Sequence, residues 1–184
     1  YSDLGFIILG QIIETITGFS LDLFERHAVF QQLGMKQTLY TPKKYYKRIV
    51  VPTSFGNPYE YRMVHDSSLG FTFKEINPEQ WNGWRNYPLK GEVNDGNCWY
   101  ACEGVNGAAG LFSTVADLQL LVNMLLNKEP GGLISKKTRD LFLTKDQFNN
   151  GLGWMMDPVN SLMKNAPEGS FGHTGFTGTC IAVV

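Results

Sequence analysis

Residues 172–184 read Gly-His-Thr-Gly-Phe-Thr-Gly-Thr-Cys-Ile-Ala-Val-Val. The end of this stretch, Thr179–Val184, is rich in β-branched residues and predicts a strand. Ser170–Gly172 predicts strand structure just before the glycine-rich turn, and Gly151–Met156 predicts more of it upstream. The C-terminal part of the chain is therefore expected to be rich in strands.

The rest of the chain carries helical patterns. Leu4–Thr17 has the apolar density of a buried helix, apolar on all sides, with Gly18 as a natural stop. Ser20 is expected to cap a second helix that runs to about Leu33. Two further helices are predicted with their capping residues: Val115–Asn127 after Ser113 or Thr114, and a shorter one from Ser135 to about Leu143. The chain therefore combines helices and strands.

Between Thr41 and Gly110 the periodic patterns stop, and proline, glycine and asparagine become frequent. Long irregular stretches of this kind are often binding loops. This one holds Trp81, Trp84 and Trp99. Aromatic rings in such a loop either line a cleft or pin the loop down, and we favour pinning because rings supply most of the burial that a loop can gather.

Composition narrows the function classes. The 184 residues include 43% hydrophobic and 18% charged residues, as in an ordinary globular domain, and the formal net charge is −1. This balance predicts no broad attraction to nucleic acid or to anionic lipid. No apolar run is long enough for a transmembrane helix, and no signal peptide is visible.

The chain has three cysteines, Cys98, Cys102 and Cys180. An odd number argues against a complete disulfide framework. No histidine or further cysteine follows Cys102 at metal-binding spacing, so the sequence predicts no zinc site. We expect buried or half-buried thiols, which pack as small hydrophobic groups.

Two short motifs carry the functional case. Tyr1-Ser2-Asp3 directly precedes the first helix, and His173-Thr174-Gly175 precedes Phe176 and the last predicted strand. Either triplet alone is a weak signal, because such triplets occur often by chance. Their order, separation and flanking structure are together much more specific.

With Leu33-Gly-Met-Lys36 and Ala109-Gly-Leu-Phe-Ser-Thr-Val-Ala-Asp-Leu118, these motifs resemble the β-lactamase-related serine hydrolases. That family includes class C β-lactamases, penicillin-binding proteins, D-alanyl-D-alanine carboxypeptidases and related esterases, and the likeness is to bacterial wall-associated members, some fused to a glycoside hydrolase. The resemblance implies an α+β fold of the β-lactamase/transpeptidase type: a helical lobe and part of an antiparallel sheet flanked by helices, with the active site between them.

The resemblance also implies roles for individual residues. A serine in Ser-x-x-Lys attacks a carbonyl and forms an acyl-enzyme. Tyr1 resembles the tyrosine that exchanges protons with this serine, and Asp3 stands where asparagine is usual. His173 stands where lysine is usual on the strand that binds substrate. Thr174 follows it, Gly175 permits close approach of the substrate, and the backbone N–H of Phe176 resembles an oxyanion donor.

Departures from the family pattern change the expected chemistry. A carboxylate at Asp3 disfavours a nearby tyrosinate, which makes Tyr1 a poorer base. An imidazole at His173 is only partly charged near neutral pH, so it anchors a substrate carboxylate less firmly than lysine would. The esterase-like branch also uses histidine here, which points away from penicillin specificity. Ala108 stands where close relatives carry histidine, and it receives no role.

The nucleophile is expected to be absent from these residues. The one Ser-x-x-Lys is Ser161-Leu-Met-Lys164, which lies between prolines and follows the tyrosine motif instead of preceding it, so we do not take Ser161 as the nucleophile. Both ends of the chain look cut, and we expect residues 1–184 to be a partial domain, truncated at both ends. Alone, it should fold poorly and show no acyl transfer.

Other polar positions have simpler explanations. His27 and His65 are interpreted as surface or packing residues. Residues 91–97, Gly-Glu-Val-Asn-Asp-Gly-Asn, resemble a motif of the same relatives, so Asn94 and Asp95 are candidates for the border of the cleft. A polar turn needs no function, however, and both readings stay open.

The sequence thus predicts part of a serine hydrolase that cleaves an amide or ester, with a peptidoglycan-derived peptide or a small ester as substrate. Alternatives are a catalytically inactive binding domain of the same fold and a true β-lactamase. No cofactor and no metal are expected, and the resemblance implies a periplasmic or extracellular location. If the assignment holds, the Tyr1 hydroxyl and the His173 ring lie within roughly 10 Å, close enough to share one substrate group.

Overall fold

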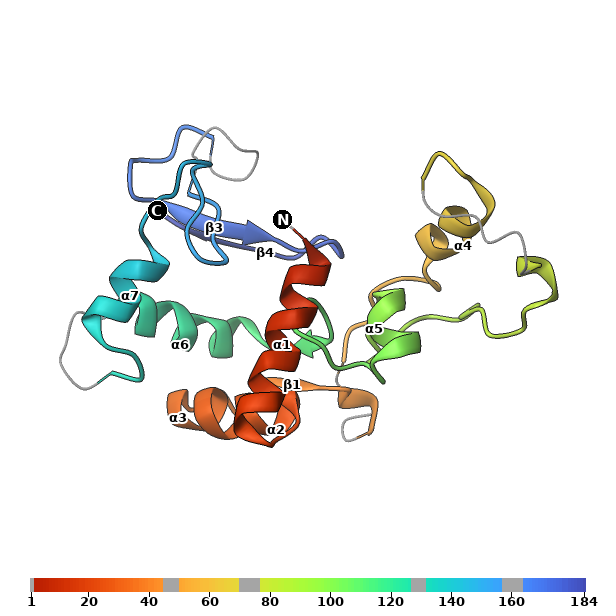
Figure 1. Ribbon diagram of the computed structural model, residues 1–184, viewed down its shortest axis with the longest axis horizontal. Helices are drawn as coiled ribbons and strands as arrows, with labels where there is room; N and C mark the ends of the chain where they lie inside the picture. The colour runs from red at the N-terminus through yellow and green to blue at the C-terminus, as the bar shows by residue number, and fades with distance from the viewer. Residues whose placement is uncertain (1, 45–49, 70–76, 127–131, 157–163) are drawn as a thin grey trace. The chain divides into compact units, whose positions relative to one another are not determined.

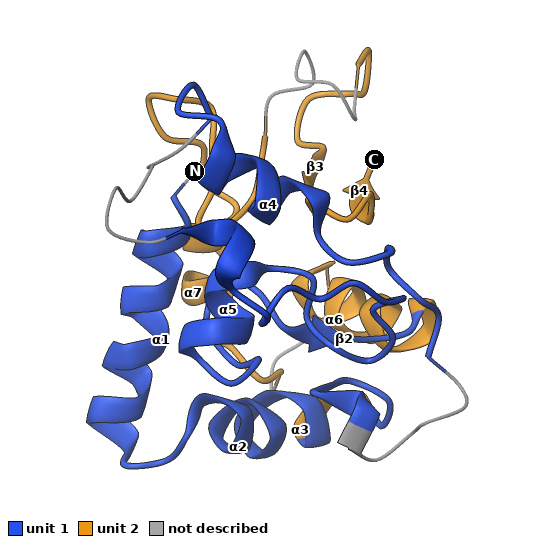
Figure 2. Cartoon of the chain, turned by 90° about the vertical axis from the view of Figure 1, so that its right-hand side faces the viewer, with its two compact units in different colours: residues 1–31, 36–114 blue, residues 32–35, 115–184 orange. Residues whose placement is uncertain are grey.

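The computed structural model describes residues 2–44, 50–69, 77–126, 132–156 and 164–184 (Figure 1). The chain divides into two compact units (Figure 2). Unit 1 comprises residues 1–31 and 36–114, and unit 2 comprises residues 32–35 and 115–184. Each unit combines helices with a short antiparallel pair of strands, so the fold is of the α+β class.

Helix α1 spans Asp3–Thr17, as the apolar run predicts. Ser2 caps its start, where the hydroxyl accepts a hydrogen bond from the Gly5 N–H at 3.4 Å. Gly18 ends the helix with a φ of 72°, a left-handed conformation that glycine adopts without strain. The predicted stop at Gly18 is thus confirmed, and Ser2 supplies a cap that was not predicted.

Among the described residues, α1 is covered on one side only, so many of its apolar side chains are exposed. Leu4 is 65% exposed and Ile16 is 78% exposed. Packing is confined to the side of the helix that carries Gly10, its one buried residue. A Cβ on Gly10 would lie 3.2 Å from the backbone nitrogen of Gly107, and a Cβ on Gly107 would lie 2.1 Å from the Phe6 carbonyl oxygen. Glycine on both sides therefore lets α1 pack directly on the turn around Gly107.

The predicted second helix is present but irregular. It consists of α2 (Leu21–Glu25), the π-helical turn η1 (Arg26–Phe30) and α3 (Gln31–Leu33). Ser20 stands at the N-cap position without a side-chain capping bond, and its hydroxyl donates to Asp22 Oδ1 instead, at 2.6 Å. The Leu21 N–H is satisfied by Glu14 Oε1 at 2.8 Å, which ties α2 to α1.

Strand β1 (Leu39–Tyr40) pairs antiparallel with β2 (Leu111–Phe112), which closes unit 1 across its irregular middle. The Tyr40 hydroxyl donates to Glu25 Oε2 at 3.1 Å and so connects this sheet to α2. Burial raises the pKa of Glu25 and of Tyr40, because neither charged form is well solvated there.

The irregular segment between Thr41 and Gly110 contains helices that its composition did not predict. They are the 3₁₀ turns η2 (Pro42–Lys44) and η3 (Pro78–Gln80) and the helices α4 (Pro58–His65) and α5 (Gly96–Ala101). The tryptophans do pin this segment. Trp81 and Trp84 meet edge to face at 4.6 Å, and the guanidinium of Arg85 lies 5.1 Å from the ring centre of Trp99.

Unit 2 is built on α6 (Val115–Leu126) and α7 (Lys136–Phe142), close to their predicted positions. Ser135 caps α7 by accepting from the Thr138 N–H at 3.1 Å, as expected. The buried core of this unit is Leu125, Met156 and Phe171. Partly buried apolar side chains surround that core: Met124, Ile134, Leu143, Trp154 and Val183.

The strands of unit 2 are β3 (Phe171–Thr174) and β4 (Cys180–Val183), which form an antiparallel hairpin. The predicted strand at Gly151–Met156 is reduced to single bridges, in which Met155 pairs with Gly172 on the other edge of β3. No single described helix is long and apolar enough to cross a membrane. Taken together, α1 and the helical stretch Leu21–Leu33 have the length and composition of a membrane span, but the two are bent by 77° relative to each other.

Candidate functional site

The β3–β4 hairpin carries every predicted substrate-strand residue. His173 and Thr174 end β3, and Gly175 and Phe176 begin the turn that leads to β4. Opposite His173 stands Ile181, and opposite Thr174 stands Cys180. Phe176 is 78% exposed, so this end of the hairpin is open to solvent. The four residues therefore form one continuous, accessible strip of backbone.

The ring of His173 is oriented by its own strand. Its Nδ1 lies 2.7 Å from the carbonyl oxygen of Thr174. A carbonyl oxygen can only accept, so Nδ1 must carry the proton in this contact. The neutral ring then has its lone pair on Nε2, the nitrogen that can take up a proton. This imidazole is half-buried, and its Nδ1 is held by the backbone of its own strand.

Two glycines of the hairpin have close neighbours. A Cβ on Gly172 would lie 2.3 Å from the Ile181 carbonyl oxygen of the partner strand. A Cβ on Gly175 would lie 2.3 Å from Thr179 Oγ1, and the Gly175 N–H donates to the Thr179 carbonyl at 2.7 Å. At Gly172 the two strands therefore lie too close together for a side chain, whereas at Gly175 the side chain of Thr179 occupies the space.

The other half of the predicted site belongs to unit 1. Asp3 is exposed and occupies the first position of α1, where a carboxylate is favoured by the positive end of the helix dipole. Tyr1 and Ser161 lie outside the described residues. Asp3 and His173 belong to different units, so the closeness of Tyr1 to His173 stays a prediction.

Asn94 and Asp95 have structural partners in unit 1. Asp95 caps α5 by accepting from the Cys98 N–H at 2.7 Å. Asn94 accepts from Asn57 Nδ2 at 3.0 Å through its carbonyl oxygen, and its own Nδ2 donates to Ser54 at 2.8 Å. A local scaffolding role explains both residues, although their partner Asn57 lines the pocket described below.

A buried ion pair that the sequence did not predict organises the same region. The side chains of Arg85 and Glu60 are 2% and 13% exposed, and Nη2 lies 2.5 Å from Oε1. Arg85 also donates to the carbonyl oxygens of Val93 and Asn94, at 2.5 and 2.7 Å. Burial raises the pKa of Glu60, and the charge of Arg85 opposes that shift. A Cβ on Gly96 would lie 2.4 Å from Glu60 Oε1, so glycine makes room for the pair.

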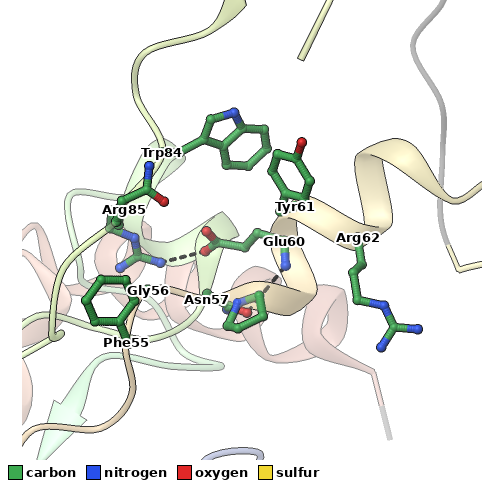
Figure 3. A pocket seen from close by; sticks show the side chains of 10 residues that line it. Phe55, Gly56, Asn57, Glu60, Tyr61, Arg62, Trp84 and Arg85 are labelled. Carbon is green, nitrogen blue, oxygen red and sulfur yellow. Dashed lines mark hydrogen bonds and ion pairs between the residues drawn. The ribbon is translucent and has the colours of Figure 1, made fainter. Parts of the chain in front are cut away.

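A pocket of about 420 Å³ lies next to this ion pair (Figure 3). Its lining residues come from two segments of the chain, residues 55–62 and residues 84–86. Its rings come from Phe55, Tyr61 and Trp84, and its polar groups include Arg62 and Asn86. The motifs did not reveal this pocket, because its lining residues follow no spacing pattern. The only sequence signal was the aromatic content of the irregular segment.

Ala108 helps to form the turn that supports α1. The N–H groups of Ala108 and Ala109 both donate to Asn106 Oδ1, at 2.9 and 2.8 Å. This turn includes Gly107, on which α1 packs. The role of position 108 is thus carried by its backbone.

The cysteines differ in exposure. Cys98 is buried and Cys102 is half-buried, as expected, but Cys180 is exposed on β4, because its side chain points away from the core of unit 2. Among the described residues, no group of three or more histidine, cysteine, aspartate or glutamate side chains is arranged to hold a metal ion.

Comparisons with known proteins agree with this architecture. The family model for β-lactamase matches residues 1–184. A Bacillus subtilis protein named N-acetylmuramyl-L-alanine amidase is 33% identical over 97% of this chain. A Salmonella typhi protein with the provisional name D-alanyl-D-alanine carboxypeptidase is 30% identical over all of it. The chain spans 40% of the first of these relatives and 41% of the second.

Among solved structures, the octameric penicillin-binding protein homologue from Pyrococcus abyssi matches 97% of this chain with a TM-score of 0.56. The identity is 20%, and 33% of that protein is covered. This likeness establishes the fold, which is of the β-lactamase/transpeptidase type, as the motifs predicted.

Proposed function

Because this chain belongs to the β-lactamase family, we propose that the whole protein is a serine hydrolase that cleaves an amide or ester by acyl transfer. A serine oxygen attacks the substrate carbonyl, the leaving group departs with a proton, and water then hydrolyses the acyl-enzyme. The proposal concerns the whole protein because these residues span about two fifths of the length of the relatives.

The residues of this chain would act around that serine. Tyr1 takes the proton from the serine hydroxyl and passes it to the leaving group, and Asp3 follows it two residues later, at the start of α1. On β3, the His173 ring binds a substrate carboxylate, while Thr174 and Gly175 lie alongside the substrate on the same strand. The N–H of Phe176 donates to the oxyanion. The nucleophile is not assigned here, because Ser161 stands in the wrong order for the family.

The observation that carries the proposal is the geometry of the hairpin. The bond from His173 Nδ1 to the Thr174 carbonyl fixes the ring near an open strand end, where Phe176 is exposed. A histidine held in this way can meet an anionic group of a substrate with Nε2.

A peptidoglycan-type peptide is the substrate that the relatives favour. One relative is named as a muramyl-alanine amidase and another as a D-alanyl-D-alanine carboxypeptidase, and both names describe amide bonds of the cell wall. A free C-terminal carboxylate on such a peptide would be the partner of His173. Small esters remain the second substrate class of the same reaction.

The test is a set of variants in the whole protein, assayed with a D-alanyl-D-alanine peptide and a nitrophenyl ester. Tyr1→Phe should lower kcat/KM by about 10²–10⁴-fold, as loss of an acid–base group does. His173→Ala should raise KM for the peptide more than for the uncharged ester. His27→Ala, an exposed histidine on η1, is the matched control and should change neither.

An unchanged kcat/KM in the Tyr1→Phe variant would reject Tyr1 as the acid–base group. Efficient turnover of nitrocefin with no peptide hydrolysis would identify a true β-lactamase instead. A whole protein that binds the peptide but hydrolyses neither substrate would be an inactive binding domain of the same fold.

A further inference from the structure

The pocket beside the start of α4 takes no part in the proposed reaction, and its shape and chemistry indicate a ligand of its own. Its volume of about 420 Å³ falls within the range of small-molecule sites. The side chains that define it are Phe55, Asn57, Tyr61, Arg62, Trp84 and Asn86, all of unit 1. Figure 3 shows the rings of Tyr61 and Trp84 above the pair formed by Glu60 and Arg85.

The floor of the pocket is electrically balanced. Arg85 is buried, but its charge is compensated by Glu60, whose Oε1 lies 2.5 Å from Nη2. Arg62 is the remaining charged residue of the lining; it is exposed, and Figure 3 shows its guanidinium pointing away from the rings. A strongly charged ligand would therefore find little net charge to oppose its own. The formal net charge of −1 for the chain also disfavours a nucleotide phosphate.

The walls of the pocket are held in place before any ligand binds. The Trp84 indole N–H donates to the Pro78 carbonyl oxygen at 2.9 Å. Trp84 also meets Trp81 edge to face at 4.6 Å and Tyr61 at 5.3 Å, and Tyr61 stacks on His65 at 3.9 Å. Rings fixed by such contacts lose little conformational freedom when a ligand covers them. Phe55, by contrast, is 67% exposed and open to contact.

We propose that this pocket binds a hexopyranose unit of a glycan strand. The face of an aromatic ring carries partial negative charge and attracts the C–H groups on the apolar side of a sugar ring. The hydroxyl and N-acetyl groups at the sugar's rim would reach Asn86, which supplies a hydrogen-bond donor at the edge of the pocket. A neutral, flat ligand with polar groups at its edge therefore matches a pocket with aromatic walls, in which the charge of Arg85 is compensated by Glu60.

The identity of the glycan rests on the proposed function, because a peptidoglycan peptide is attached to a strand of N-acetylated hexoses. The pocket would then hold one sugar unit of such a strand. Binding of the sugar is nevertheless separable from hydrolysis, since none of the pocket residues belongs to the proposed catalytic set.

The test is titration of the whole protein with the tetramer of N-acetylglucosamine, followed by tryptophan fluorescence and by calorimetry. We expect saturable binding. Trp84→Ala and Phe55→Ala should each weaken it by at least about fivefold, as the loss of one stacking ring predicts. Tyr59→Ala is the matched control, because Tyr59 is a 40% exposed ring on α4 that does not line the pocket. The affinity of this variant for the sugar should be unchanged.

Phe55→Ala keeps the test valid if Trp84→Ala fails to fold, because Phe55 is exposed and its removal leaves the ion pair and the tryptophan contacts intact. Absence of saturable binding would overturn the proposal. Equal affinity in the Phe55→Ala and Tyr59→Ala variants would overturn it as well, as would binding of a free D-alanyl-D-alanine peptide in place of the sugar. Sugar binding without peptide hydrolysis would reject the proposed reaction and leave the glycan site standing.

Discussion

At the residue scale, the buried pair of Arg85 and Glu60 offers a sharp test of what stabilises unit 1. Removing one partner of a buried ion pair leaves the other charge without compensation. Glu60→Gln should therefore lower the free energy of unfolding by about 3 kcal/mol. This is the low end of the usual range, because Arg85 keeps its hydrogen bonds to the carbonyl oxygens of Val93 and Asn94. Urea denaturation followed by tryptophan fluorescence measures this change.

Glu79→Gln is the control for that experiment. Glu79 is an exposed carboxylate on η3, so its neutralisation should change stability by less than about 0.5 kcal/mol. If Glu60→Gln and Glu79→Gln had the same small effect, the guanidinium of Arg85 would be stabilised by its carbonyl and ring contacts alone.

The cysteines give a second test at this scale, based on thiol reactivity. Burial, reinforced by the charge of Asp95, raises the pKa of Cys98 to about 12. The thiolate is the reactive form, so at pH 8 roughly one Cys98 in ten thousand is ionised. Iodoacetamide at pH 8 should label the exposed Cys180 first and spare Cys98 until urea unfolds the chain. Mass spectrometry of the peptides measures the order in which the cysteines are labelled. Early labelling of Cys98 would show that α5 opens readily.

At the scale of elements, the sequence predicted a helix wherever an apolar period and a cap occurred together. α1 and α7 begin at serine caps and end near their expected residues. α4 and α5 were missed because they are short and have no apolar period. Their caps were visible, however: Asn57 before Pro58 at α4, and Asp95 at α5. Here local capping and tertiary contacts, not periodicity, select the helix.

The β3–β4 hairpin yields a prediction at the same scale. In a Gly172→Ala variant the new methyl group would lie 2.3 Å from the Ile181 carbonyl oxygen, so the strands must separate. Overpacking of this kind costs about 1–3 kcal/mol. The variant should unfold at a lower temperature, with an early change in the fluorescence of Trp154, whose ring meets Phe171 at the start of β3 at 5.1 Å.

Gly132→Ala serves as the comparison for the hairpin variant. A Cβ there has its nearest neighbour, the Ile134 carbonyl oxygen, at 3.8 Å, an ordinary contact. Its melting temperature should stay close to that of the parent protein. A Gly172→Ala protein as stable as Gly132→Ala would mean that the hairpin accommodates a wider strand spacing.

At the scale of the whole molecule, motifs and long-range contacts were predictable to different degrees. The resemblance identified the fold and gathered His173, Thr174, Gly175 and Phe176 on one strip, because those residues are neighbours in sequence and the hairpin keeps them so. The partnership of Glu60 with Arg85 joins segments without any shared pattern, and the pocket above it follows from that partnership. Such contacts depend on tertiary packing, which no local signal encodes.

The final prediction concerns residues 1–184 produced by themselves. Acyl transfer needs a serine whose hydroxyl is activated by a neighbouring base. The sequence holds one Ser-x-x-Lys, at Ser161–Lys164, and it follows the Tyr1 motif instead of preceding it, between Pro158 and Pro167. We therefore expect this polypeptide to form no adduct with a fluorescent serine-acylating probe, as read on a denaturing gel beside an active serine hydrolase. A labelled band that disappears in a Ser161→Ala variant would contradict this and would make Ser161 the nucleophile in an order that the family does not use.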